Sequence, residues 1–129
     1  MFTIAQIKEA HSKVKSGADF PQYIQDLIQL GVQGYDTFVN DGHVEYFGEN
    51  NFRAAATETY DSISIAPSAN KERFIEFLVM HQDGQTDYLT FCKHAGQCGI
   101  AKWSVNIIEM VCTYYDSAEN PILIEKIPE

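Results

Sequence analysis

The sequence predicts an α+β fold, in which a mixed antiparallel sheet of about six strands carries helices on one face. The chain lies over itself at an offset of 68 residues without a gap, which indicates an internal duplication. Within each half, apolar spacing typical of amphipathic helices gives way to the alternation typical of strands. A length of 129 residues suits one domain. We therefore predict a single domain, residues 1–129, built from two α-α-β-β-β repeats at about 1–66 and 67–129.

The duplication is predicted from the register of structural signals more than from identity. Only four of the 33 positions between 16 and 48 are identical to their equivalents. A helix-starting Asp, an apolar stripe, a closing Gly and an aromatic strand entry nevertheless recur at the same offset. We expect residues 16–48 and 84–116 to superpose as the same helix-strand-strand unit.

Two helices are expected at the start of the first repeat. Thr3 with Gln6 forms a capping-box pattern, and we expect Lys13, Lys15 and Gly17 to close the helix that follows. A second helix should begin at Asp19, with Pro21 in its first turn, and end at Gly31.

The dipeptide Asp41-Gly42 lies between two alternating runs and is a strong hairpin signal. We expect strands at 35–40 and 43–47 joined by a two-residue loop, so that Asn40 pairs with His43. One face of this hairpin should pack on the helices, and it carries Tyr35, Thr37, Val39, Val44 and Tyr46. The alternating residues 62–65 predict a further strand.

The second repeat is expected to follow the same order. A helix over about 68–82 precedes one that begins at Asp87 and ends near Gly99. Strands are expected from Trp103 to Ile107, around Cys112 to Tyr115, and at 122–127. The turn at Glu109-Met110 lacks the glycine of the first hairpin, so we expect a longer or differently shaped loop there.

Charge and cysteine content narrow the function classes. The formal net charge of −9 repels phosphate backbones, so we expect no nucleic-acid partner. We find no apolar stretch long enough for a membrane span and no signal peptide. An odd number of cysteines, three, indicates reduced thiols and a cytoplasmic location. Cys92, Cys98 and Cys112 align with aliphatic residues of the first repeat, so we expect buried thiols without metal.

The predicted outer face of the sheet is the favoured binding surface. Its residues have the strand parity opposite to the core set, and the candidates are Phe38, His43, Glu45, Phe47, Ile108, Val111 and Tyr115. Apolar residues gathered on an uncovered face usually mark a partner surface. The alternative reading is that loops or the C-terminal strand cover them.

The first predicted hairpin also carries an imidazole and several carboxylates close together in sequence. His43 and Glu45, with Asp41 and Asp36 nearby, have side chains that can bind a metal or act as acid and base. One hairpin face does not bring three ligands together, so a solvated strand face is the favoured reading. We assign no catalytic residue, no metal site and no cofactor.

The sequence resembles a known family in several segments. These are residues 7–11, 16–21, 35–43, 46–48, 102–103 and 112–116, which read IKEAH, SGADFP, YDTFVNDGH, YFG, KW and CTYYD. They are similar to the YdfO-like family (DUF1398) of small bacterial proteins of unknown function, some of which carry the label "phage envelope protein". The resemblance implies a compact α+β domain and a prophage origin. It supplies no catalytic residues.

Two hypotheses for function follow. The favoured one is a non-enzymatic interaction module whose partner is a protein, either a host factor or a second copy that forms a dimer. The alternative is a small-molecule-binding domain, or an undescribed enzyme, that uses a groove between the repeats. Tyr46, Trp103 and Tyr114 would then face a ligand.

Overall fold

The computed structural model describes residues 2–14, 19–56 and 60–127. In these residues the element order α-α-β-β-β occurs twice. The first set is α1 (Ile4–His11), α2 (Phe20–Leu30), β1 (Val32–Phe38), β2 (Val44–Gly48) and β3 (Arg53–Ala56), with a 3-10 turn, η2 (Glu49–Asn51), before β3. The second set is α3 (Lys71–Gln82), α4 (Tyr88–Gln97), β4 (Lys102–Asn106), β5 (Val111–Tyr115) and β6 (Pro121–Lys126).

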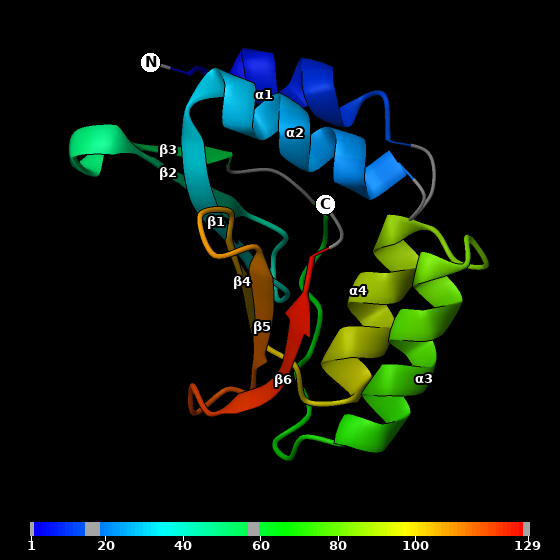
Figure 1. Ribbon diagram of the computed structural model, residues 1–129. Coiled ribbons are helices and arrows are strands. Elements are labelled where there is room, and N and C mark those ends of the chain that lie inside the picture. Colours follow the sequence, from blue (N-terminus) through cyan, green and yellow to red (C-terminus); the bar gives the residue numbers. More distant parts are fainter. Residues whose placement is uncertain (1, 15–18, 57–59, 128–129) are drawn as a thin grey trace.

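The six strands form one sheet in the order β3-β2-β1-β4-β5-β6, and each neighbouring pair is antiparallel. The first strands of the two halves, β1 and β4, therefore pair at its centre. Both helix pairs lie on one side of the sheet, α1 and α2 over one part and α3 and α4 over the other (Figure 1). The predicted α+β fold with helices on one face is confirmed.

The core lies between the helices and the inner face of the sheet. Side chains from all four helices join one cluster with the inner strand residues. Phe74 of α3 packs its ring 4.9 Å from that of Tyr114, and Phe91 of α4 packs 5.5 Å from Trp103. The core set predicted for the first hairpin is on this face, with Tyr35, Thr37, Val39 and Tyr46 buried and Val44 half-buried.

Three of the predicted helix boundaries are confirmed. Thr3 and Gln6 form the reciprocal capping box at α1, Asp87 accepts from the backbone N–H of Thr90 at 2.8 Å, and Gly31 ends α2 in the left-handed conformation. Helix α1 is shorter than predicted and ends at His11. The hydroxyl of Ser12 donates to the carbonyl of Glu9 at 2.6 Å, a local bond that competes with helix continuation. Lys15 and Gly17 lie outside the described residues.

The pairing predicted for the first hairpin is wrong by two residues. Thr37, not Val39, is opposite Val44, and residues 39–43 connect the strands. The backbone carbonyls of the predicted last pair have other partners, because that of Asn40 accepts from the N–H of Ile63 and that of His43 accepts from the N–H of Phe38. A shift of two keeps every side chain on its face, so the predicted inner and outer sets survive.

The strand predicted at 62–65 does not form. The third strand of the first half is β3, at 53–56. The N–H of Ile63 donates to Asn40, and that of Ala66 donates to Gly96 at the end of α4. The alternation of Ile63 and Ile65 thus reflects contacts with a loop and a helix instead of a sheet.

The second hairpin has the same strand register as the first. The expected longer or differently shaped loop at Glu109-Met110 does not occur. Tyr35 pairs with Tyr46 in the first hairpin, and their equivalents Trp103 and Tyr114 pair in the second. Met110 adopts a left-handed φ of 56° at the position where Gly42 has 80°. The second turn therefore places methionine in the left-handed conformation, which a non-glycine residue adopts less easily than glycine.

Candidate functional site

The outer face of the sheet is the side that points away from the helices. Alternation and strand register place on it the residues Asp36, Phe38, Glu45, Phe47, Arg53, Lys102, Ser104, Val111, Thr113, Tyr115, Ile124 and Lys126. We include His43 and Ile108, which adjoin it in the two hairpin loops. Within the described residues no helix lies over this side (Figure 1).

The predicted strand residues all have side chains on this face, but they lie in different rows across the sheet. Phe38, Lys102 and Tyr115 follow one another across β1, β4 and β5, so the two halves contribute to one row. The predicted strand residues are half-buried, while Ile108 is 71% exposed. Ile124 on β6 is 64% exposed and was not predicted as part of the site. Its place opposite Thr113 depends on the order of the strands, which the sequence did not supply.

The aromatic rings of the outer face lie next to basic groups. The ammonium nitrogen of Lys102 is 5.1 Å from the ring centre of Tyr115 and 5.9 Å from that of Phe38. The guanidinium carbon of Arg53 is 4.8 Å from the ring centre of Phe47. A cation over an aromatic face is attracted by the ring quadrupole. The face is therefore an aromatic surface interleaved with positive charge, and not the purely apolar patch that the sequence suggested.

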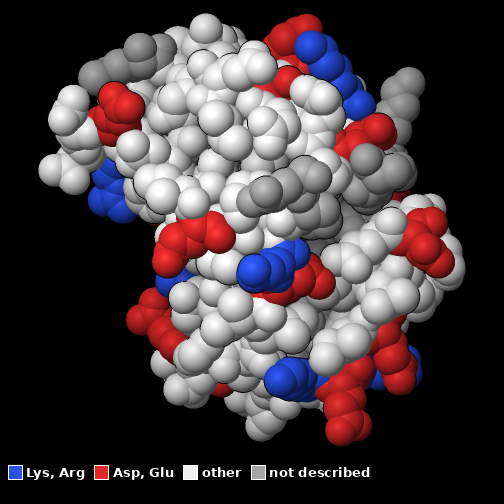
Figure 2. Space-filling model, viewed as in Figure 1, with Lys and Arg blue, Asp and Glu red and all other residues white. Residues whose placement is uncertain are grey.

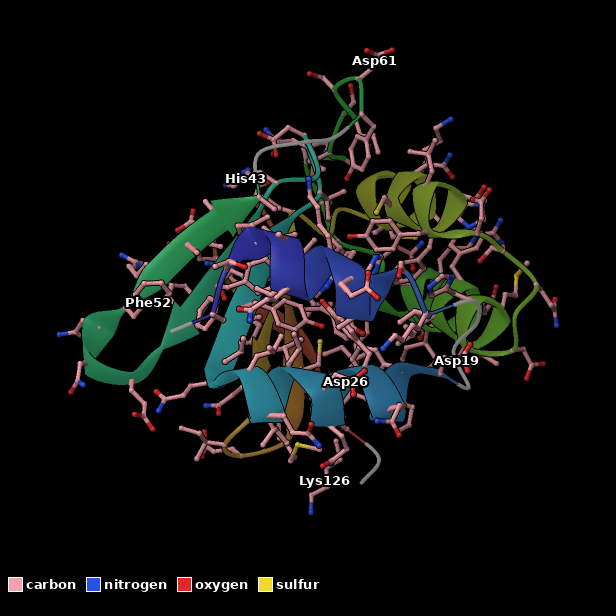
Figure 3. The ribbon with its side chains drawn as sticks, turned by 90° about the horizontal axis from the view of Figure 1, so that it is seen from above. Asp19, Asp26, His43, Phe52, Asp61 and Lys126 are labelled. Atoms are coloured by element: carbon pink, nitrogen blue, oxygen red, sulfur yellow. The ribbon has the colours of Figure 1, made fainter. Side chains whose placement is uncertain are left out.

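His43 is held between two carboxylates at the end of β2. Its Nδ1 lies 2.7 Å from Oδ1 of Asp41, and its Nε2 lies 3.4 Å from Oε2 of Glu45. The imidazole stacks on the ring of Phe38, with centres 4.2 Å apart and planes 3° from parallel. Arg53 approaches the other oxygen of Glu45 at 3.8 Å. Figure 3 shows His43 at one end of the β2–β3 ribbon and Phe52 at the other.

These contacts shift the acid–base equilibria of the cluster. Desolvation lowers the pKa of His43, but hydrogen bonds and charges from Asp41 and Glu45 outweigh it and raise the pKa above its ordinary value. The backbone N–H of His43 donates to Asp41 at 3.0 Å, and this bond lowers the pKa of that carboxyl. The arrangement favours a positively charged ring between two negative groups.

Within the described residues, this cluster is not part of a metal-binding group of side chains. In residues 2–14, 19–56 and 60–127, no group of three or more His, Cys, Asp or Glu side chains has a geometry that could hold a metal ion. In the part of the chain that the structure describes, His43 contacts the carboxylates of Asp41 and Glu45 and the ring of Phe38, and none of these groups is a hydroxyl or thiol nucleophile. The two carboxylates of the cluster hold the His43 ring in one orientation at the outer face.

Both signs of charge are present on the outer face. Arg53, Lys102 and Lys126 lie on its strands with Asp36 and Glu45. The whole chain carries −9, so the outer face is much less acidic than the rest of the molecule. On the side shown in Figure 2, acidic and basic side chains occur in small neighbouring groups without a single large basic patch.

The residues of the alternative groove are part of the core. Tyr46, Trp103 and Tyr114 are only 6%, 7% and 6% exposed. Burial raises the pKa of the Tyr114 hydroxyl well above its ordinary value. A small cavity of about 190 Å³ lies instead near the ends of α2 and β2, where Phe2, Leu30 and Phe52 contribute to its lining. None of the three predicted aromatics reaches it.

All three cysteines are buried and free of disulfide bonds. Burial raises the pKa of each thiol, that of Cys112 to about 12. A thiol with a raised pKa carries little of the reactive thiolate at neutral pH. The prediction of buried thiols is confirmed, and their freedom from metal stays a prediction.

Comparison with known proteins gives one result. A family model described as "Protein of unknown function (DUF1398)" matches residues 8–126. No curated protein matches the chain. None of the helices in the described part is long and apolar enough to cross a bilayer.

Proposed function

Because the chain belongs to the DUF1398 family, whose function is unknown, we propose its role from the structure: it is a binding module that associates through the outer face with a second copy of itself. One observation carries this proposal. The rings of Phe38, Phe47 and Tyr115 are half-buried, and Ile108 and Ile124 are exposed, on a side that no described helix covers. Apolar groups so arranged are stabilised when a partner removes them from water.

The charges of the outer face favour a second copy as the partner. A two-fold dimer needs a surface complementary to itself. Arg53 and Lys102 provide positive groups, and Asp36 and Glu45 provide negative ones, on the same face as the aromatic rings. A rotated copy can therefore oppose unlike charges while the rings come together. A partner with one dominant charge finds no such match.

The size of the sheet indicates a weak association. Six strands at about 4.8 Å spacing span roughly 25 Å, and five residues per strand span roughly 17 Å. The product of these two lengths, counted for both copies, is an area at the low end of those buried by specific protein–protein interfaces. In addition, two copies of charge −9 repel one another at low salt. We expect a dissociation constant in the micromolar range and tighter association as salt is raised.

The test is sedimentation equilibrium of the wild type and of the double variant Phe38→Ser with Phe47→Ser. Full burial of a phenylalanine side chain is worth about 1.5–3 kcal/mol. Losing two such groups from each copy should weaken the dimer at least about 100-fold. The matched control is Ile75→Ser with Val79→Ser, which changes two residues on α3 that are 37% and 54% exposed. The control should keep the wild-type dissociation constant.

Two results would contradict self-association through this face. A wild type that stays monomeric at several hundred micromolar means that the partner, if any, is another protein. An unchanged dimer in the double variant means that copies meet elsewhere. Thermal melts accompany both measurements, because a collapsed melting temperature in the double variant would show that the rings belong to the core.

The same proposal includes the setting of the protein. We place it in the cytoplasm, which is supported by three buried, unpaired thiols. A prophage origin is supported by the resemblance of its motifs alone. A non-enzymatic role is supported by the outer face, whose charged groups pair with one another and with aromatic rings.

A further inference from the structure

We propose that His43 makes the self-association of the outer face sensitive to pH, with the protonated ring as the associating form. This inference rests on the function proposed above and concerns the regulation of the same site. It is carried by the position of one imidazole between two carboxylates.

The position of the ring between two carboxylates favours a donor on each of its nitrogens. Nδ1 faces Asp41 at 2.7 Å and Nε2 faces Glu45 at 3.4 Å. Ionised carboxylates only accept, and a neutral imidazole has one N–H and one lone pair. In the neutral ring one nitrogen would therefore present its lone pair to a carboxylate. Only the doubly protonated ring satisfies both neighbours.

The surroundings of the ring contain few other charges that could replace it. On β3, Arg53 lies 3.8 Å from Glu45, and on β4, Lys102 lies 5.9 Å from the centre of the Phe38 ring on which His43 stacks. From the segment after β3, Tyr60 donates its hydroxyl to Val39 at 2.6 Å, beside the same loop. With a charged His43, the group formed by Asp41, His43, Glu45 and Arg53 has no net charge. Loss of the proton leaves it at −1.

Loss of the positive charge on His43 weakens the dimer, because each copy then brings a group of net charge −1 to the interface. Docking brings the outer faces together and removes water from them, so an unpaired carboxylate there opposes association. Phe38 also loses the cation that stacks on it. The second half has no equivalent arrangement, since Val111 and Thr113 occupy the positions of His43 and Glu45.

The direction of the pH effect follows from the charge that docking removes from water: the docked face favours the protonated ring, so the dimer binds this proton more tightly than the monomer and weakens as pH rises. The favourable contacts of His43 are fully present below its ordinary pKa and are lost as pH rises through the folded value. His81 is the control, because its burial lowers its pKa and moves its titration to lower pH. The two histidines therefore act in separate pH ranges.

The experiment is sedimentation equilibrium at pH 6, 7 and 8 and fixed ionic strength, with the wild type, His43→Gln and His81→Gln. We expect the wild-type dimer dissociation constant to rise at least about tenfold from pH 6 to 8, because each of the two copies loses one proton that the dimer holds more tightly than the monomer. His81→Gln should show the same rise. His43→Gln should associate weakly and without this pH dependence.

A titration of the His43 ring protons by NMR gives a second readout that does not need the dimer. Glu45→Gln removes one carboxylate and should move the midpoint of this titration to lower pH. A midpoint below about 6.5 in the wild type would overturn the inference. A dimer whose dissociation constant ignores pH, or a His43→Gln variant that keeps the wild-type pH profile, would overturn it while leaving self-association intact. A monomeric wild type would remove both.

Discussion

The two halves of the molecule share backbone geometry more closely than side-chain chemistry. Both hairpins have the same register relative to the offset of 68, with Tyr35 opposite Tyr46 and Trp103 opposite Tyr114. Left-handed residues recur at that offset too, and the equivalent pairs are Gly31 and Gly99, Gly42 and Met110, and Asn51 and Glu119. Such agreement in strained positions is expected of a repeated backbone. A common origin of the halves stays a prediction.

The outer sides of the two hairpins differ in chemistry. The first carries the Asp41–His43–Glu45 cluster, and the second carries Val111 and Thr113 at the equivalent of its last two residues. The charged cluster is not needed for this hairpin register, since the second hairpin forms the same register without one. The comparison therefore singles out the first hairpin as the one that carries the proposed pH-dependent association.

The largest expected effect concerns the reactivity of the buried thiols. They occupy positions that are aliphatic in the first half. Cys92 aligns with Ile24, and both are 0% exposed. We expect the labelling of Cys92 and Cys112 by a thiol reagent at pH 8 to be at least about a thousandfold slower than in the unfolded chain, because reaction requires opening of the core. The rates are measured with and without denaturant. Rapid labelling of Cys92 in the native protein would show that α4 does not pack as its equivalent α2 does.

Equivalent isoleucines on α1 and α3 offer the next test. Ile7 is 2% exposed, whereas Ile75, one offset later, is 37% exposed. Ile7→Ala should lower the free energy of unfolding by about 2–5 kcal/mol, because it leaves a cavity in the core. Ile75→Ala should lower it by less than about 1 kcal/mol. Urea unfolding of both variants measures the difference, and equal losses would contradict the asymmetric packing.

The glycines that end α2 and α4 give a smaller contrast. Both have positive φ, 93° at Gly31 and 77° at Gly99. A Cβ at Gly99 would overlap the carbonyl oxygen of Ser68, whereas one at Gly31 meets no atom of the described residues within 4 Å. Gly31→Ala should cost about 1–2 kcal/mol for the left-handed backbone. Gly99→Ala should lower the free energy of unfolding by clearly more. An equal or smaller loss than that of Gly31→Ala would mean that the backbone around Ser68 moves away from the added Cβ at little cost.

Much of the fold could be predicted because it depends on local signals. The capping box at Thr3, the cap at Asp87 and the alternation from Trp103 to Ile107 each act within a few residues. The errors arose where distant backbone groups compete. Ile63 donates to the carbonyl of Asn40 that a tight Asn40–His43 pair would have used, and the 62–65 segment thus bonds to a loop instead of a strand.

The sequence predicted which strand side chains lie on the outer face, but not which charged groups lie beside them. Parity alone assigned Phe38, Glu45 and Phe47 to the outer face, and the structure agrees with that placement. The charges that lie over the rings come from β3 and β4, whose positions beside β2 and β1 are set by the strand order. A pattern within one strand carries no information about that order. The aromatic and basic groups could therefore be found singly but not as pairs.

The smallest expected effect concerns the turn between β5 and β6, where Glu119 has a φ of 65° at the position that Asn51 occupies with 63°. Asn adopts this conformation more readily than Glu. Glu119→Asn should therefore raise the free energy of unfolding by about 0.5 kcal/mol relative to Glu119→Gln. Both variants remove the exposed ion pair with Lys102, 3.1 Å in length, so their difference isolates the backbone contribution. The converse change, Asn51→Glu, should lower stability by a similar amount. Urea unfolding decides, and a lower stability for Glu119→Asn than for Glu119→Gln would show that this left-handed residue is not the equivalent of Asn51.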